Sequence, residues 1–441
     1  MKNEEILSGV KQMAARDLLN EEQAVKYIKD NTDLFSSNAQ LLAQILNSQS
    51  LSVNGLANNL ILIEDEYSGQ KVILKEVLPY VRQAAEDNVH IPLPQQRIYA
   101  EYYSIKLMEE ICPGVVPEIY LFDEKNNIFI FEYLENMELL RSELIRGNKY
   151  SHLGENLADF LARKAFFTSE FFLEENEFNA LVDFFERSKA VEVWDKFIFL
   201  GAVLDASDKS INPYLEEEII DFRSKKYVRQ NVEELRHLFK NKKQCLIHGD
   251  FHTSNIFVNE EEIKIFDTEF SMYGPSSYDM GRLLANIILN YASLISEAYS
   301  KKRKDFQIYL IDLIEEIYER YIYLFSRYFE EFSEYDNSHL EEYFDNYLSE
   351  VISFTGCTMI MRIYEEGLCL DFKRITNLKQ RSLGQGFIIE LAEELFKKHA
   401  ELKNIKDLTN FIYRFSLEYE VSQVVNLILE VSKNIKKISA S

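Results

Sequence analysis

The secondary-structure signals of this chain fall into two blocks, and this division limits its fold more than any other feature. Short runs rich in Val, Ile, Leu and Phe, which are typical of strands, lie at Asn59–Glu64, Lys71–Leu78, Pro117–Phe122 and Asn127–Tyr133. One helical segment, Pro94–Ile111, separates the second run from the third. From about residue 151 the pattern is mainly helical. We therefore expect an α+β fold with a small β-sheet lobe of five-stranded type and a large, mostly helical lobe.

The length of the chain agrees with such a division. Its 441 residues exceed what one hydrophobic core usually supports, so two or three domains are expected. We expect a first lobe at residues 1–134, with helices over residues 1–50 and Asn20 as a helix N-cap, then a linker at 135–150 and a helical lobe at 151–441. The helical segment after Leu402 has two interpretations, as part of the core or as an oligomerisation helix.

Composition excludes several classes of function. The net charge of −24 argues against broad binding to nucleic acid or anionic membranes, and any bound nucleotide would need magnesium and a well-placed Lys or Arg. The four cysteines are scattered and form no CxxC pair, so reduced thiols are expected. No apolar run approaches the ~20 residues that span a bilayer, and the first residues lack a signal-peptide core, so we expect a cytoplasmic protein.

The segment Cys245–Phe266 interrupts the helical block with a hairpin-like pattern and carries a dense group of polar residues. A short apolar run ends in His248-Gly249-Asp250, so Asp250 is expected on a loop at a strand end. In phosphoryl transfer, a carboxylate in this position orients the acceptor hydroxyl and accepts its proton. The alternative is a turn aspartate that hydrogen-bonds its own backbone. The polar residues that follow favour the catalytic interpretation.

Oxygen-bearing side chains near Asp250 are suited to a magnesium ion. Asn255 offers a neutral amide oxygen, and Asp267 and Glu269 follow the apolar run Ile263–Phe266. Such carboxylates hold magnesium against ATP phosphates in kinases. The alternatives are a loop cap for Asn255 and solvated turn acids for Asp267 and Glu269.

Two histidines flank the candidate base. The HxxxH spacing of His248 and His252 would align both rings for zinc only on a helix, and Gly249 and the preceding strand argue against a helix. We expect structural roles instead, with His248 holding the loop through hydrogen bonds.

The strand-rich block carries candidate nucleotide contacts. Lys75 follows the strand-like run at residues 71–74, and Glu101 lies on the helical segment, so the two can form the Lys–Glu ion pair that positions ATP phosphates. Ordinary surface charges are the alternative for both. The segment 53–59 has one glycine and is a weak candidate for a loop that covers phosphates, and no GxxxxGK[ST] motif exists. Glu132, Tyr133 and Leu134 end the block, where a crease between lobes would receive adenine.

In this order, these segments resemble the aminoglycoside phosphotransferase-like branch of the protein kinase fold and, within it, the methylthioribose kinase family. The resemblance rests on LIHGDFHTSN and on DTEFSMYGPSSYDMG with the apolar helix that follows, over residues 246–290. VLPYVR at 77–82 and FTGCTMIMR at 354–362 are also similar to that family, and the similarity covers roughly residues 20–400.

The resemblance implies a two-lobed protein kinase-like fold that uses ATP and Mg²⁺. It implies transfer of the γ-phosphate to the 1-hydroxyl of 5-methylthioribose in methionine salvage, by a homodimer. Asp250 would contact the sugar hydroxyl as the base, and Arg362 would help to hold the substrate. Asp267 and Glu269 would hold metal and phosphates, and Asn255 would join them as a metal ligand. The residues expected around ATP are Asn58, Asn59, Lys75, Glu101, Glu132, Tyr133, Leu134, Asp267, Thr268 and Glu269.

Three positions depart from the pattern of that family and leave the acceptor open. Met361 stands where an arginine tends to precede the counterpart of Arg362, Asn255 stands where a serine is seen, and Thr268 replaces a proline. A second hypothesis keeps the reaction and changes the acceptor to an aminoglycoside, choline or another small alcohol. A third is a catalytically silent nucleotide-binding scaffold, which would not need the full set of polar residues.

Overall fold

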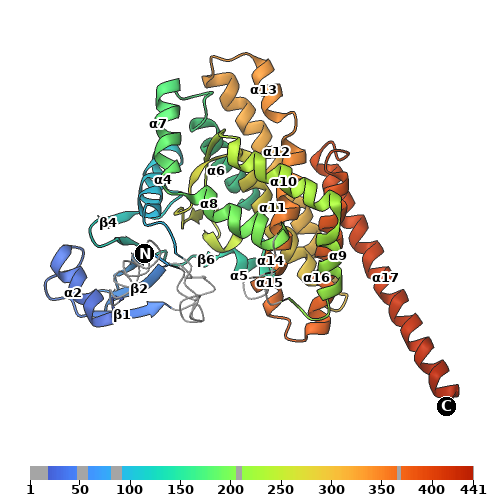
Figure 1. Cartoon of the computed structure of the whole chain (residues 1–441). Helices are drawn as coiled ribbons and strands as arrows, with labels where there is room; N and C mark the ends of the chain where they lie inside the picture. Colours follow the sequence, from blue (N-terminus) through green and yellow to red (C-terminus); the bar gives the residue numbers. More distant parts are fainter. Residues whose placement is uncertain (1–17, 47–57, 81–91, 205–210, 365–368, 441) are drawn as a thin grey trace, which may run out of the picture. The chain divides into compact units, whose positions relative to one another are not determined.

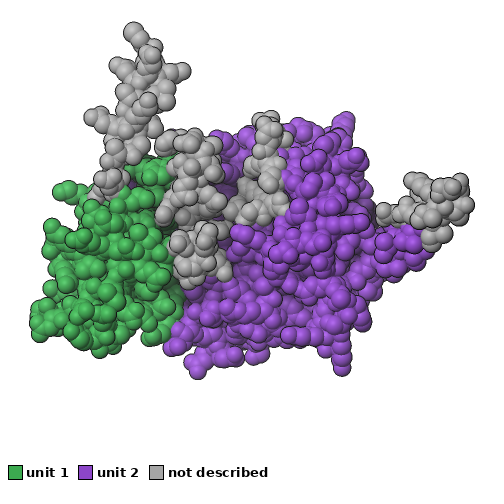
Figure 2. Space-filling view, turned by 90° about the horizontal axis from the view of Figure 1, so that it is seen from below, with its two compact units in different colours: residues 1–98, 117–135 green, residues 99–116, 136–441 purple. Residues whose placement is uncertain are grey.

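The computed structural model describes residues 18–46, 58–80, 92–204, 211–364 and 369–440. Two compact units divide the chain: residues 1–98 with 117–135, and residues 99–116 with 136–441 (Figure 2). Residues 53–57 of the predicted phosphate-covering loop lie outside the described residues.

The smaller unit is built on a five-stranded antiparallel sheet with the strand order β1-β2-β3-β5-β4. Alternation of buried and partly buried side chains along β2 is typical of a strand with one face on a core. The strands are β1 (Leu41–Leu46), β2 (Asn58–Asp65), β3 (Lys71–Val77), β4 (Ile119–Asp123) and β5 (Ile128–Glu132).

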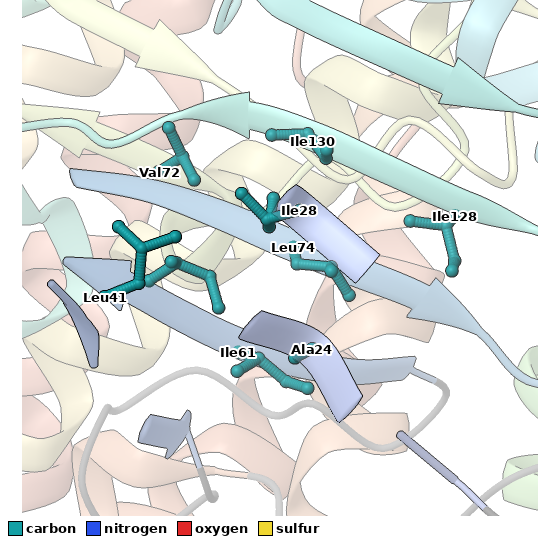
Figure 3. Close-up of a cluster of buried hydrophobic side chains, with 9 residues drawn as sticks. Ala24, Ile28, Leu41, Ile61, Val72, Leu74, Ile128 and Ile130 are labelled. Atoms are coloured by element: carbon teal, nitrogen blue, oxygen red, sulfur yellow. The ribbon is translucent and has the colours of Figure 1, made fainter. Parts of the chain in front are cut away.

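The helix α2 (Glu21–Asn31) covers one face of this sheet. Its N-cap is Asn20, as predicted: the side chain accepts a hydrogen bond from the backbone N–H of Gln23 in a capping box. Ala24 and Ile28 of the helix pack onto apolar side chains from four strands (Figure 3). Removal of these side chains from water stabilises this unit.

The prediction of helix throughout residues 1–50 is wrong at β1. Leu41–Leu46 pairs antiparallel with β2, from Leu41 opposite Asp65 to Leu46 opposite Leu60. This edge strand supplies the fifth strand of the sheet. The run LLAQIL is too short to distinguish a strand from a helix by periodicity, and pairing with β2 decides the outcome.

The larger unit is mostly helical, and Figure 1 shows its helices gathered around α11. The described elements of the two units confirm the predicted α+β class, with the five-stranded sheet in the smaller unit and most of the helices in the larger one. Its helices are α4 (Arg97–Ile111, which begins at the end of the smaller unit), α5 (Leu140–Arg146), α6 (Leu153–Phe167), α7 (Glu175–Glu186), α8 (Ala190–Trp194), a π-helix (Asp195–Leu204), α9 (Glu216–Ser224), α10 (Lys226–Asn241), α11 (Ser276–Ile295), α12 (Lys301–Phe332), α13 (Asn337–Phe344), α14 (Tyr347–Tyr364), α15 (Leu370–Lys373), α16 (Leu378–Lys398) and α17 (Ile405–Ala440).

Two small sheets in this unit replace the single hairpin expected at Cys245–Phe266. The strand β7 (Cys245–Ile247) pairs with β10 (Met272–Gly274), whereas β8 (Ile256–Val258) pairs with both β9 (Ile263–Ile265) and β6 (Glu138–Leu139). The loop with Asp250 and the segment that follows β9 therefore start from different sheets.

The helices α11 and α17 represent opposite extremes of burial. All residues of α11 are buried, and Gly281 lets its backbone approach α14, since an added Cβ would lie 2.7 Å from the Cβ of Phe354. The C-terminal part of α17 runs away from the other helices of its unit (Figure 1). Several apolar side chains on it, such as Val421 and Ile428, are exposed. Among the described helices, none is both long and apolar enough to cross a membrane.

Candidate active site

The loop that carries Asp250 turns sharply at the end of β7, and Gly249 makes this turn feasible. Gly249 has φ +80°, a left-handed conformation that favours glycine. A Cβ added there would lie 2.3 Å from the backbone oxygen of Phe270. Both the backbone conformation and the available space therefore require glycine beside the candidate base.

A buried ion pair holds this turn. The carboxylate of Asp279, on α11, accepts hydrogen bonds from the backbone N–H of His248 at 2.7 Å and of Gly249 at 3.1 Å. Lys164, on α6, pairs with the same carboxylate, and both side chains are almost fully buried. A buried carboxylate is stable when it is paired and hydrogen-bonded, so the pair fixes the loop on two helices.

The two histidines are fixed as neutral rings by their hydrogen bonds. Nδ1 of His248 accepts from the backbone N–H of Asp250 at 3.2 Å, so its Nε2–H donates to the carbonyl of Phe266 at 3.0 Å. The predicted loop-holding role of His248 is confirmed by these bonds. Nδ1 of His252 accepts from the N–H of Ser254 at 3.1 Å, which leaves its Nε2–H facing Asp250 Oδ2 at 3.3 Å. Burial lowers the pKa of His252 to about 3, more than Asp250 raises it.

Positive side chains surround the carboxylate of Asp250. Arg282, on α11, forms an ion pair with Oδ1, and NH2 of Arg362 lies 3.8 Å from the same oxygen. Burial alone would raise the pKa of Asp250, but the neighbouring His252, Arg282 and Arg362 outweigh it and hold the pKa well below its ordinary value. Asp250 is therefore ionised and can accept a hydrogen bond from a hydroxyl group.

Two of the predicted metal ligands flank the same end of the strand pair of β8 and β9. Asn255 precedes β8 and Asp267 follows β9, and the N–H of Phe266 donates to the carbonyl of Asn255 at 3.2 Å. The side-chain N–H of Asn255 donates to the carbonyl of Asp250 at 3.0 Å. This bond uses the amide nitrogen, so the side-chain oxygen of Asn255 is the atom that could bind a metal ion. Asp267 has φ +63°, a left-handed conformation that costs free energy in a non-glycine residue and that occurs repeatedly at active sites.

These donors fit a hard divalent cation. One amide oxygen and the carboxylates of Asp267 and Glu269 are the oxygen ligands that magnesium prefers. Among the described residues, no group of three or more His, Cys, Asp or Glu side chains is arranged to hold a metal on its own. A magnesium ion here would therefore complete its coordination with water and phosphate oxygens, which would supply charge neutralisation for phosphoryl transfer.

The residues expected around ATP are divided between the two units. In the smaller unit, Lys75 is buried on β3, and the oxygen of Asn58 accepts from Arg97 at 3.3 Å. The amide of Asn59 donates to Glu76 and to the carbonyl of Leu19, both at 3.1 Å. Asn59 thus ties the segment before α2 to the sheet.

In the larger unit, Glu101 is buried on α4, and its carbonyl accepts from the hydroxyl of Thr268 at 3.4 Å. This bond connects α4 to the segment after β9. The ion pair between Lys75 and Glu101 remains a prediction.

The predicted hinge residues lie next to the boundary between the units, which falls after Glu135. The carboxylate of Glu132 accepts from the N–H of Glu118 at 3.1 Å, and the carbonyl of Tyr133 accepts from the N–H of Glu135 at 2.9 Å. The ring of Tyr133 lies 5.4 Å from Nζ of Lys71, and Leu134 is partly buried.

Sequence reasoning missed Lys164 and Arg282, and it quoted Asp279 only as part of a motif. A usable signal exists in α11: Asp279, Arg282, Asn286 and Asn290 recur at helical spacing within an otherwise apolar run. This polar stripe is buried, so it must contact other polar groups. The partner Lys164 gives no comparable signal, because a lysine on α6 looks like a surface residue in the sequence.

The family comparison agrees with this chemistry. Residues 89–302 match the model of APH, described as the phosphotransferase enzyme family. The chain is 27% identical over 359 residues to a methylthioribose kinase of Bacillus pumilus, covering 80% of this chain and 88% of that protein. A methylthioribose kinase of Bacillus cereus is 27% identical over 399 residues, covering 88% of this chain and 96% of that protein. The comparisons therefore show similarity to the phosphotransferase enzyme family over residues 89–302 and to methylthioribose kinases over most of the chain.

Solved structures give more distant similarities. A Plasmodium vivax ethanolamine kinase has a TM-score of 0.47 and 16% identity, over 88% of this chain and 94% of that one. A choline kinase of Cryptosporidium parvum has a TM-score of 0.45 and 12% identity, over 89% of this chain and 99% of that one.

Proposed function

We propose that this protein is a kinase that transfers the γ-phosphate of ATP to the 1-hydroxyl of 5-methylthioribose or a related 5-modified ribose. The observation that supports it most is an ionised Asp250, held by a glycine turn and by Asp279, with the side-chain amide of Asn255 hydrogen-bonded to its carbonyl. The named relatives at 27% identity favour the sugar.

In this proposal, Asp250 orients the acceptor hydroxyl and receives its proton. Asn255, Asp267 and Glu269 hold magnesium, and Arg362 holds the sugar. The residues that contact ATP are Lys75, which pairs with Glu101, then Asn58 or Asn59, and Thr268. The adenine hinge is formed by Glu132, Tyr133 and Leu134. Positioning and the charge of metal and cations supply most of the acceleration in phosphoryl transfer.

A second candidate is a kinase for a cationic alcohol such as choline or an aminoglycoside. Arg282 and Arg362 lie beside Asp250, and Arg141 pairs with Asp371 at 3.1 Å. These buried arginines argue against a cationic acceptor, which would be brought close to their positive charges. The silent scaffold is disfavoured, since the turn at Gly249 and the strained Asp267 are costs that binding alone does not require.

The test is a panel of acceptors offered to purified protein with magnesium and ATP: methylthioribose, 5-deoxyribose, ribose, choline and kanamycin. We expect turnover of methylthioribose or 5-deoxyribose, with phosphate on the 1-hydroxyl. Turnover of kanamycin or choline alone would reject the sugar. ATP binding, shown by a thermal shift, without turnover of any acceptor would favour the scaffold.

We also propose that the protein forms a homodimer through α17. Leu417, Val421, Val424, Ile428 and Val431 alternate in steps of four and three along this helix, and each is at least 44% exposed. This is the spacing of a coiled-coil seam, which a second copy of the same helix matches. A second copy is therefore the occupant that we infer for this face.

A further inference from the structure

The segment after β9 forms a tight turn that carries one of the predicted metal ligands. The N–H of Ser271 donates to the carbonyl of Thr268 at 3.0 Å, so these two residues close a four-residue turn. Glu269 and Phe270 are its two central residues. Glu269 is only 1% exposed, so its side chain lies inside the protein. The position of the turn therefore determines where this carboxylate can be presented.

Both ends of this turn are hydrogen-bonded to one short stretch of α4. Oγ of Ser271 lies 2.9 Å from Oγ of Ser104, a hydrogen-bond distance between two buried hydroxyls. At the other end, the hydroxyl of Thr268 donates to the carbonyl of Glu101 at 3.4 Å. Glu101 and Ser104 are three residues apart, which is less than one helical turn. We call Ser104, Thr268 and Ser271, with the carbonyl of Glu101, the hydroxyl clamp.

The turn is also held on the side of the candidate base. A Cβ added to Gly249 would lie 2.3 Å from the backbone oxygen of Phe270, so the turn packs directly on the loop of Asp250. After Ser271 the chain enters β10, which pairs with β7, the strand that leads to Asp250. The turn is thus fixed by α4 at one side and by the loop of Asp250 at the other.

A turn that is fixed in this way should favour magnesium over calcium. Magnesium requires nearly ideal octahedral geometry with bonds of about 2.0–2.1 Å, whereas calcium accepts longer bonds and flexible geometry. Groups that orient the ligands of a metal, without touching it, also decide how well it is bound. Attachment at both ends of the turn keeps Glu269 from adjusting to the larger ion.

We propose that the hydroxyl clamp holds Glu269 in place and thereby makes the predicted metal site selective for magnesium over calcium. Ser104, Thr268 and Ser271 are positioning residues in this proposal, because they act through Glu269 and not on the reacting atoms. The inference rests on the proposed kinase function and deepens it, since it accounts for the choice of the metal ion that accompanies ATP.

The test compares the binding of ATP with each metal. The affinity for a non-hydrolysable ATP analogue is measured by calorimetry in excess magnesium, in excess calcium and in EDTA, and the wild type should bind most tightly in magnesium. Ser271→Ala should bind about three- to tenfold more weakly in magnesium, the factor for one lost hydrogen bond. Its affinity in calcium and in EDTA should change by less than about twofold, because calcium tolerates a displaced ligand.

Two further variants remove the clamp from other positions. Ser104→Ala loses the same hydrogen bond from the side of α4, so it should reproduce the effect of Ser271→Ala. The double variant should bind no more weakly than either single variant, because one bond is lost in all three. Thr268→Val keeps the shape of the side chain and removes the longer bond to α4, so a smaller change in the same direction is expected.

The matched control is Ser416→Ala. Ser416, on α17, is also buried, and its Oγ lies 2.7 Å from the hydroxyl of Tyr291. This variant loses a buried hydroxyl pair between two helices, but it should keep the magnesium preference of the wild type. Circular dichroism and thermal melts show whether each variant is folded, and Ser104→Ala decides the question if Ser271→Ala is not folded.

The preference for magnesium separates this inference from the proposed function. A wild-type protein that phosphorylates no acceptor rejects the kinase proposal, whereas the ratio of its affinities in magnesium and calcium still judges the clamp. The same ratio in the wild type and Ser271→Ala, or a wild type without a magnesium preference, overturns the inference while the acceptor panel keeps its meaning. An equal loss of preference in Ser416→Ala also overturns it, because lost stability would then explain the effect.

Discussion

At the residue scale, Asp250 combines features that a turn residue does not need. Its carboxylate contacts a neutral histidine and two arginines, and its backbone is held through Gly249 by Asp279. These contacts keep the carboxylate ionised and fixed in position. An acceptor hydroxyl would therefore meet a preorganised base, which would not need to rearrange during proton transfer.

Asp250→Asn keeps the shape of the side chain and removes its ability to accept a proton. We expect turnover to fall by about 10²–10⁴-fold. Affinity for ATP, measured by calorimetry with magnesium present, should remain within about threefold of wild type, since the proposed partner of Asp250 is the acceptor and not ATP. Turnover close to that of the wild type would show that another group is the base.

The cysteines are protected by burial. Burial raises the pKa of the thiols of Cys112, Cys245, Cys357 and Cys369 to about 12. A raised pKa leaves a thiol protonated and unreactive below that value, so the native protein should not react with Ellman's reagent at pH 8. After unfolding in guanidinium chloride, all four cysteines should react. Rapid labelling of the folded protein would mean that the helical unit opens.

At the element scale, α11 connects the loop of Asp250 to the rest of the larger unit. Its buried polar stripe begins with Asp279, continues through Arg282, and ends with Asn286 and Asn290, which contact Arg141 and Asp371. The helix α11 also packs closely on α14, the helix that carries Arg362. The separation of these two helices thus sets how Arg282 and Arg362 approach Asp250.

A substitution at the contact of α11 with α14 should therefore affect both stability and the site. In Gly281→Ala the new Cβ would lie 2.7 Å from the Cβ of Phe354 and 2.9 Å from the carbonyl of Val351. We expect a loss of about 1–3 kcal/mol in the free energy of unfolding, measured by urea denaturation.

Gly356→Ala, on α14, is the matched control for this prediction. Its Cβ would lie 3.4 Å from the ring of Phe396, so the methyl group needs little space, and alanine favours a helix over glycine by about 1 kcal/mol. We expect this variant to be neutral or more stable than the wild type. Equal destabilisation of both variants would contradict the importance of the α11–α14 contact.

How far the sequence predicts these elements depends on whether the signal is local. The cap at Asn20 and the strands β2 to β5 follow from nearby residues, and the structure agrees with them. Leu41–Leu46 becomes a strand because β2 offers it a partner, which no local pattern records. Arg282 was missed for the same reason, since its burial against Asp250 depends on how α11 packs.

At the scale of the whole molecule, charge is distributed unevenly. The chain has a net charge of −24, yet three buried arginines, Arg141, Arg282 and Arg362, pair with the carboxylates of Asp250 and Asp371. The net charge of a chain does not by itself select a substrate. Charge recognition at the candidate site would therefore depend on these buried arginines, where screening by salt is weak.

The exposed face of α17 leads to a prediction about assembly. Burial of five side chains such as Val424 and Ile428 against a second copy would remove apolar surface from water, which favours association. We expect light scattering after size-exclusion chromatography to give twice the chain mass of 51.9 kDa. Val424→Glu combined with Ile428→Glu should give the chain mass, because two charges would enter the seam.

The control for this pair places the same charges on the other side of the helix. Ser422 and Asn426 are exposed and lie outside the four-and-three spacing, so Ser422→Glu with Asn426→Glu should leave the dimer intact. Both double variants should keep wild-type kinase activity if the two active sites work independently. A wild-type protein that elutes at its chain mass, or a dimer that survives the charges at 424 and 428, would show that α17 does not join two copies.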